Sequence, residues 1–158
     1  MAKRQNIEIA GFKHSNPIPA ACRLGNMLMT GIITGMDPAT GKLAPTLEAQ
    51  CAFMFGHVRA IMAAAGGSTD DIIKMSVWMA DRSQREVLNR EWLKMFPDEH
   101  ARPARHTSRS TVRPAHLASA TRIGSTGRYA SAPLVVTDGP RYRCDSMRRS
   151  VVGSASPT

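Results

Sequence analysis

One arginine in this sequence stands in a pattern that suits carboxylate chemistry. Arg105 follows Pro103-Ala104 near the start of a predicted strand, and a helical pattern over residues 89–96 precedes it. A guanidinium group is planar, keeps its charge and presents a fork of donors that matches a carboxylate. A small molecule that carries a carboxylate is therefore the first ligand to consider.

The histidines suggest no second reactive centre. Their spacing puts no two on one face of a predicted helix, so we expect no metal site. They are His14, His57, His100, His106 and His116. His106 adjoins Arg105, but successive side chains of a regular strand point to opposite faces, so a packing or solvent-facing role fits it better than that of a base.

The cysteines indicate a reducing compartment. Cys22, Cys51 and Cys144 are odd in number and form no CxxC pair, which argues against a disulfide framework and against structural zinc. Cys51 falls in the apolar stripe of a predicted helix and is most simply a small buried hydrophobe. The first residues contain no apolar run long enough for a signal peptide or a membrane span. We expect a cytoplasmic protein without membrane contact.

The elements that must position Arg105 begin with a hairpin and a helix. Residues 21–24 and 27–30 flank Gly25-Asn26, a pair that suits a tight two-residue turn between antiparallel strands. From Thr46, a plausible N-cap, the apolar period changes to that of a helix, with Gly66-Gly67 as its end. The apolar stripe contains Leu47, Cys51, Met54, Val58, Ile61 or Met62, and Ala65.

A strand, a second helix and the strand of Arg105 follow. Residues 72–79 alternate, which predicts one face with Ile73, Met75, Val77 and Met79 and another with Lys74, Ser76 and Trp78. Asp81 or Ser83 can cap a helix that ends near Phe96. Its apolar side combines Leu88, Trp92, Met95 and Phe96. The order predicts an α+β domain with two helices on one face of a mixed sheet.

The net charge of +9 is concentrated late in the chain. Residues 1–108 hold 13 Lys/Arg against 10 Asp/Glu, whereas residues 109–158 hold 8 against 2. The late segment is also rich in Ser, Thr, Gly, Pro and Arg, a composition typical of poorly folded chain. Nucleic-acid binding is therefore expected, if at all, only through this basic tail.

Several short motifs recur in a fixed order over roughly residues 16 to 117. They are Leu24-Gly25-Asn26-Met27, Asp37-Pro38-x-Thr40-Gly41, Gln50, Ala64-Ala65-Gly66, Asp71-Ile72-Ile73-Lys74, Asp81, Asn89-x-x-Trp92-x-x-x-Phe96 and Pro103-Ala104-Arg105. This ordered set resembles the Rid family of reactive-intermediate deaminases, the YjgF-like proteins once labelled translation inhibitors or L-PSP endoribonucleases.

The resemblance implies a chorismate-mutase-like fold that assembles as a homotrimer, with ligand sites in the clefts between subunits. It implies hydrolysis of imines and enamines, such as 2-iminobutanoate and 2-iminopropanoate, to 2-oxo acids and ammonia without a cofactor. Arg105 would hold the substrate carboxylate, and Thr107 and Ile33 would also bind the substrate. Thr107 stands where well-studied members have a cysteine.

Two departures from the family pattern concern the chemistry. Ile18-Pro19-Ala20 stands where many members have Gly-Pro-Tyr, so a phenolic hydroxyl is missing, and Glu99 is the last glutamate although the family's closing strand usually supplies one. A non-catalytic member that binds small carboxylates, or RNA through the tail, is therefore the alternative function.

The resemblance stops after Leu117, which predicts a domain over residues 1–117 and a basic, low-complexity tail over residues 118–158. We hypothesise a frame-shifted or otherwise replaced carboxy terminus, with a basic disordered extension as the alternative. The coding DNA tests this, because a frame shift requires that another frame encode an apolar strand with an acid.

Overall fold

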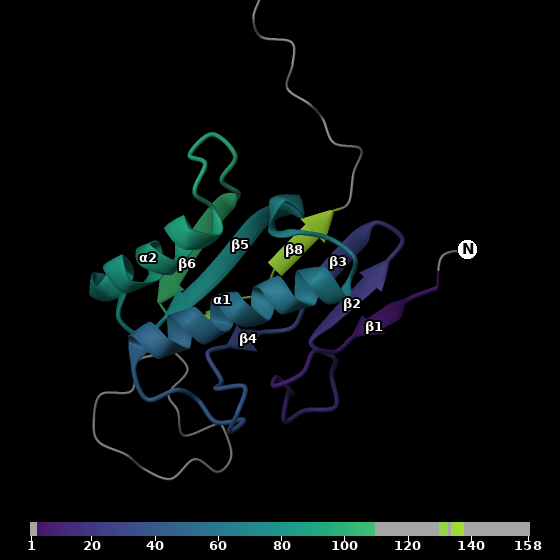
Figure 1. The fold of residues 1–158 in the computed structure, drawn as a ribbon, viewed down its shortest axis with the longest axis horizontal. Coiled ribbons are helices and arrows are strands. Elements are labelled where there is room, and N and C mark those ends of the chain that lie inside the picture. Colours follow the sequence, from purple (N-terminus) through teal and green to yellow (C-terminus); the bar gives the residue numbers. More distant parts are fainter. Residues whose placement is uncertain (1–2, 110–129, 133, 138–158) are drawn as a thin grey trace, which may run out of the picture.

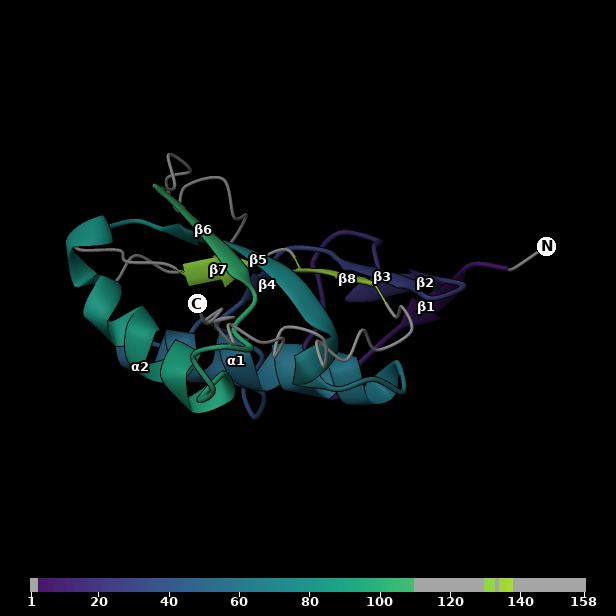
Figure 2. The ribbon, with the colours of Figure 1, turned by 90° about the horizontal axis from the view of Figure 1, so that it is seen from above.

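A mixed sheet with two helices on one of its faces makes up the computed structural model of the protein, which describes residues 3–109, 130–132 and 134–137 (Figures 1 and 2). The strands are β1 (Gln5–Ile7), β2 (Ala21–Leu24), β3 (Met27–Thr30), β4 (Ile33–Thr34), β5 (Ile72–Met79), β6 (Ala104–Arg109), β7 (Ala130–Ala132) and β8 (Leu134–Thr137). The helices are α1 (Leu47–Ala64) and α2 (Arg85–Met95), with short 3-10 turns η1 (Thr69–Asp71) and η2 (Arg82–Gln84). The predicted α+β class is confirmed.

The long strand β5 organises the sheet. The strand order is β1-β2-β3-β8-β5-β7-β4, and β6 pairs with the remaining edge of β5. The β5–β6 pair is parallel, whereas every other pairing between the strands is antiparallel. A parallel neighbour requires a crossover connection, and α2 provides it. The helix that lies beside β6 is therefore the one that leads into it.

The predicted hairpin is confirmed, because β2 and β3 pair antiparallel with Leu24 opposite Met27. Gly25 has a φ of 59°, a left-handed conformation that glycine adopts without a steric penalty. Helix α1 also follows the prediction. The hydroxyl of Thr46 accepts a hydrogen bond of 3.2 Å from the amide of Ala49, and Gly66, with a φ of 79°, follows the helix end.

The core lies between the sheet and α1, which buries a wider stripe than the one predicted. The predicted side chains from Leu47 to Met62 are all buried, and Phe55, Gln50 and His57 join them. The start of α1 lies close to the segment after β4, since a Cβ on Gly35 would stand 2.3 Å from the Cα of Gln50. Only glycine fits there. The Gln50 amide then donates to the carbonyl of Ala44 at 2.7 Å.

The alternation predicted for β5 is wrong at its start. Ile72 is buried and Ile73 is 53% exposed, the reverse of the expectation, whereas Met75, Val77 and Met79 are buried as predicted. The cause is an irregularity in the pairing with β8, whose register shifts between Ile72 and Lys74. An extra residue in one strand reverses the faces of the residues before it.

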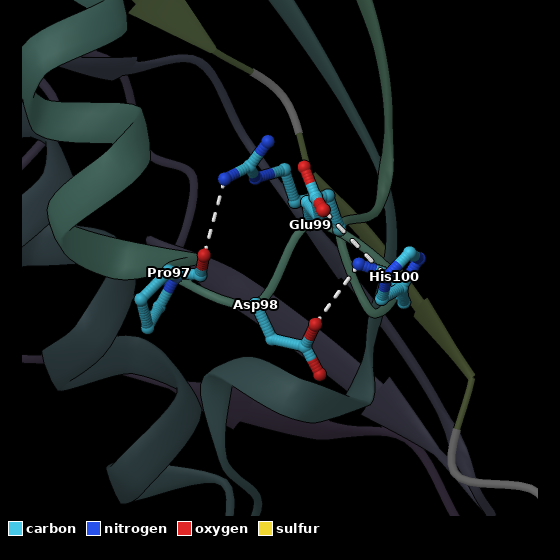
Figure 3. Close-up of polar contacts among 5 residues, drawn as sticks. Pro97, Asp98, Glu99 and His100 are labelled. Carbon is cyan, nitrogen blue, oxygen red and sulfur yellow. Dashed lines mark hydrogen bonds and ion pairs between the residues drawn. The ribbon is translucent and has the colours of Figure 1, made fainter.

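Helix α2 ends in a loop that sets where β6 begins. Asp81 accepts a hydrogen bond of 2.9 Å from the amide of Ser83, and the predicted apolar side of α2 is buried. After α2, residues 97–100 form an exposed loop with hydrogen bonds of its own, among them one from the His100 amide to the Asp98 carboxylate (Figure 3). The guanidinium of Arg102 donates to the carbonyls of Phe96 and Pro97, at 3.0 and 3.1 Å. These carbonyls follow the helix end, where a cation is favourable.

Strands β7 and β8 were not predicted, and they lie inside the sheet. β8 pairs with β3 and with the first half of β5, and β7 pairs with β4 and with the end of β5. The division into residues 1–117 and 118–158 stays a prediction, because residues 110–129, 133 and 138–158 lie outside the described part of the chain. Within the part that is described, no helix is both long and apolar enough to cross a membrane.

We predict that residues 130–137 are required for folding. A chain that ends at Leu117 lacks β7 and β8, so β3 and β5 lose the strand between them and expose two edges. It should show no cooperative thermal transition by circular dichroism. A matched chain that ends at Thr137 should unfold cooperatively, close to the full chain. Equal melting temperatures for the full chain and the chain ending at Leu117 would contradict this role.

The segment between β1 and β2 places a histidine against the β3–β4 connection. The rings of Phe12 and His14 meet edge to face with centroids 5.0 Å apart. The Nε2 atom of His14 is buried and finds no hydrogen-bond partner within residues 3–109, 130–132 and 134–137, and a Cβ on Gly31 would stand 2.7 Å from it. Burial lowers the pKa of His14, and the charge of Glu8 opposes this only in part. The neutral ring is therefore the form that the fold favours.

We predict that His14 makes the fold sensitive to acid. Because the pKa of His14 is lower in the folded protein than in the unfolded chain, the unfolded chain takes up the proton first as the pH falls below about 6.5. The free energy of unfolding should fall over that window. In urea titrations, the free energy of unfolding should fall less between pH 7.5 and pH 5.5 for His14→Gln than for the unchanged protein. His100→Gln, at an exposed histidine, is the control and should leave the loss unchanged.

Candidate functional site

The predicted site residue Arg105 lies on β6, on the face that the helices cover. In the parallel register, Met75 is opposite Arg105 and Val77 is opposite Thr107. Met75 and Val77 are buried in the core, so Arg105 and Thr107 lie on the core-facing side of the edge strand, and both are partly exposed. His106 is exposed on the opposite face, as predicted. It is therefore not beside the guanidinium.

Helix α2 holds the guanidinium of Arg105 in two ways. The Nη2 atom donates a hydrogen bond of 2.8 Å to the side-chain oxygen of Asn89. The Cζ atom lies 4.7 Å from the centroid of the Trp92 ring, a distance at which a cation is attracted to an aromatic face. The ring itself is 7% exposed, so packing fixes its orientation. Asn89 and Trp92 thus set both the position and the plane of the guanidinium.

The electrostatic setting of Arg105 suits an anion. Burial lowers the pKa of Arg105, and the positive charge of Arg85 lowers it further, although the group keeps its charge at neutral pH. The Nη1 atom is buried and has no hydrogen-bond partner among the described residues. A buried donor without an acceptor costs free energy, which a carboxylate oxygen would offset.

From the sequence, Trp92 was expected on the apolar side of the helix and Asn89 was noted only as part of a family motif, so their contact with Arg105 was missed. Asn89 and Trp92 are three residues apart, and Arg85 precedes Asn89 by four, so all three lie along one side of α2. A helix that crosses over to a parallel strand packs against that strand. The helical spacing before the strand of Arg105 was the signal that could have found them.

Of the other two predicted site residues, Thr107 lies on the same face of β6 as Arg105, whereas Ile33 lies elsewhere. Ile33 is on β4 and is 0% exposed, so a ligand would reach it only through its backbone. The pairings place Ser108, Trp78, Ser131 and Thr34 in one row across the sheet. Thr107 and Ile33 are each next to an end of that row, three strand spacings or about 14 Å apart. One chain therefore does not bring Ile33 and Arg105 to the same small ligand.

The described residues offer little other chemistry. Cys51 is fully buried, and burial, with smaller contributions from Glu91 and Glu48, raises the pKa of its thiol to about 12. Such a thiol does not serve as a nucleophile. Among the described residues, no three His, Cys, Asp or Glu side chains are grouped so as to hold a metal ion. A hollow of about 450 Å³ lies where β5 and β6 end, lined by Ala80, Asp81, Arg82, Ser83 and Arg109.

A family model described as Endoribonuclease L-PSP matches residues 11–119, more than half of the chain. The chain therefore belongs to the endoribonuclease L-PSP family, the Rid or YjgF-like proteins. It is 37% identical to the Escherichia coli K12 protein named "Putative reactive intermediate deaminase TdcF" over 94 residues, which are 60% of this chain and 70% of that relative. It is 34% identical over 83 residues, 52% of this chain and 65% of the relative, to the 2-iminobutanoate/2-iminopropanoate deaminase of Salmonella typhimurium.

Solved structures show the same fold. RidA from the Antarctic bacterium Psychrobacter matches with a TM-score of 0.70 and 25% identity, over 84% of this chain and 98% of that one. A structure of Escherichia coli TdcF with bound serine matches with a TM-score of 0.70 and 23% identity, over 85% and 99% of the two chains. The predicted family and the predicted fold are both confirmed.

We predict that Asn89 and Arg105 are energetically coupled. Asn89→Ala removes an acceptor from a partly buried cation, so the free energy of unfolding should fall by about 1–2 kcal/mol. In an Arg105→Met background the same substitution should cost less, because the donor is already gone. Urea unfolding of the two single variants and the double variant measures the coupling. Additive effects would contradict the proposed hold on the guanidinium, and Asn16→Ala, in an exposed loop, is the control.

Proposed function

We propose that this protein hydrolyses reactive imine and enamine intermediates of amino acids to 2-oxo acids and ammonia, with Arg105 as the anchor of the substrate carboxylate. One observation carries the proposal: α2 fixes the Arg105 guanidinium, while its Nη1 atom is buried without an acceptor in the part of the chain that the structure describes. The names of the relatives, and the serine bound to TdcF, an amino acid with a carboxylate, support this assignment.

The chemistry follows from placing the carboxylate on Arg105. The imine carbon is bonded to the carboxylate carbon, so two hydrogen bonds from one guanidinium fix its position. Water adds to that carbon, the carbon–nitrogen bond breaks, ammonia leaves and a carbonyl remains. Neutralising the carboxylate lowers the repulsion of the attacking oxygen. The Thr107 hydroxyl, on the same face of β6, is the proposed hydrogen-bond partner of substrate or water. No cofactor takes part in the proposed reaction.

The proposed assembly is a homotrimer in which a second chain completes each site. The sheet face away from the helices carries large apolar side chains that are exposed in one chain, and burial between subunits would remove them from water. Leu24, Met27, Met29 and Ile73 are each about half exposed. A site shared by two chains also lets the backbone of Ile33 in one chain approach Arg105 of another.

The proposed place of action is the cytoplasm. Cys22 and Cys51, the two cysteines in the described part of the chain, form no disulfide. Unbridged thiols are the ordinary state in a reducing compartment, which supports this location.

Binding of small carboxylates without turnover is the second candidate function. Ala20 stands where many family members have a tyrosine, and it is buried at 1% exposure, so no hydroxyl lines the cleft from this position. The chain also has no glutamate after Glu99 to orient water. An anchor without a group that works on water would retain the ligand and not the reaction.

We predict that Arg105→Ala abolishes both binding and hydrolysis. The assay generates 2-iminobutanoate with an amino-acid oxidase and catalase and measures the imine that semicarbazide still traps. The unchanged protein should lower the trapped fraction, whereas Arg105→Ala should reduce this effect at least about 100-fold, the loss of a charged anchor. Arg90→Ala, which removes an exposed arginine of the same helix, is the control.

Equal rates for the unchanged protein and Arg105→Ala would contradict the anchoring role. Calorimetry with 2-oxobutanoate separates the two candidate functions. Binding that requires Arg105, without any hydrolysis, would indicate the carboxylate-binding protein.

A further inference from the structure

A second arginine lies on the side of α2 that holds the anchor. Arg85 is in the first turn of α2, one helical turn before Asn89, whose amide holds Arg105. Burial is the larger cause of the lowered pKa of Arg105, and the positive charge of Arg85 is the smaller one. Two cations on facing elements repel each other; Arg85 is exposed, so water screens this repulsion in part, and an anion beside both guanidinium groups would offset the rest.

No acid in the described part of the chain forms an ion pair with either arginine. Glu91 on α2 is paired with Lys94 at 2.6 Å. Glu86 follows Arg85 directly, and adjacent residues of a helix do not face each other. The hollow of about 450 Å³ where β5 and β6 end adds two arginines, Arg82 and Arg109, and one acid, Asp81. Even with Asp81 and Glu86 counted, the end of β6 and the start of α2 carry more positive charge than one carboxylate neutralises.

We propose that the site takes substrates with two anionic groups, the imines of acidic amino acids, with Arg105 on the carboxylate beside the imine and Arg85 on the second carboxylate. This inference rests on the proposed function. The reaction is unchanged: water adds to the imine carbon, ammonia leaves, and the product is a 2-oxo dicarboxylate. Arg85 acts on a group remote from the reacting carbon, so it determines which substrate is chosen rather than how the bond breaks.

A simpler use of two arginines is that both bind one carboxylate. The two arrangements predict different effects of Arg85 on an imine substrate whose own side chain is uncharged. If both arginines hold the same carboxylate, loss of Arg85 lowers kcat/KM for every imine by the same factor. If Arg85 holds a second carboxylate, its loss acts on the dicarboxylate alone.

The test compares two imines in the semicarbazide competition assay. One is the imine of glutamate and the other is 2-iminobutanoate, each generated by an amino-acid oxidase. The unchanged protein should prefer the dicarboxylate, and Arg85→Gln should lower the ratio of the two kcat/KM values by about tenfold or more. Arg90→Gln makes the same charge change on the same helix and should keep the ratio. Circular dichroism checks that each variant is folded.

An unchanged ratio in Arg85→Gln, or no preference for the dicarboxylate in the unchanged protein, overturns the inference while the proposed hydrolysis stands. Hydrolysis of neither imine overturns the proposed function instead. Calorimetry with 2-oxoglutarate and 2-oxobutanoate then decides the inference. A preference for 2-oxoglutarate that Arg85→Gln abolishes supports it, and equal affinities of the two ligands contradict it.

Discussion

A guanidinium that is partly removed from water must find acceptors, and the packing of α2 on β6 is built around that requirement at Arg105. The crossover connection makes α2 the neighbour of β6, and the parallel register gives Arg105 the same face as buried Met75. The side chain therefore points into the seam between helix and strand. Asn89 supplies one acceptor and Trp92 an aromatic face, which leaves donors for a ligand.

This position of Arg105 depends on the two strands in the middle of the sheet, β7 and β8. β8 lies between β3 and β5, and β7 lies between β5 and β4, so residues far apart in sequence hold β5 from one side. β6 holds its other side. Without β7 and β8, the strand that sets the register of β6 would lose half of its backbone partners. The position of Arg105 on the edge strand β6 therefore depends on the central strands β7 and β8.

Local patterns predicted the parts of the fold that local chemistry decides. Gly25-Asn26 predicted the hairpin, Thr46 the start of α1, and the apolar spacing the buried side of both helices. Two other features depend on pairing between distant segments. The irregularity at Ile72 follows from the register of β8. Strands β7 and β8 are paired through backbone hydrogen bonds, which almost any residue can make, so their composition did not predict them.

In the candidate site, too, some features could be predicted from local sequence and others required tertiary packing. Arg105 could be predicted, because the motif and the chemistry of a guanidinium both point to it. Its contacts with Asn89 and Trp92, and the approach of Arg85, required the packing of α2 on β6. The contributions of Thr107 and Ile33 to substrate binding stay predictions: Thr107 shares a face of β6 with Arg105, whereas Ile33 is on β4, which one chain keeps apart from β6.

The most direct measurement is a crystal structure of the protein with 2-oxobutanoate, the stable product of the proposed reaction. We expect the carboxylate of the ligand to lie within hydrogen-bond distance of the Arg105 guanidinium, with Nη1 among the donors and the hydrogen bond from Nη2 to Asn89 retained. A carboxylate bound elsewhere in the protein, with the Arg105 guanidinium unliganded, would contradict it.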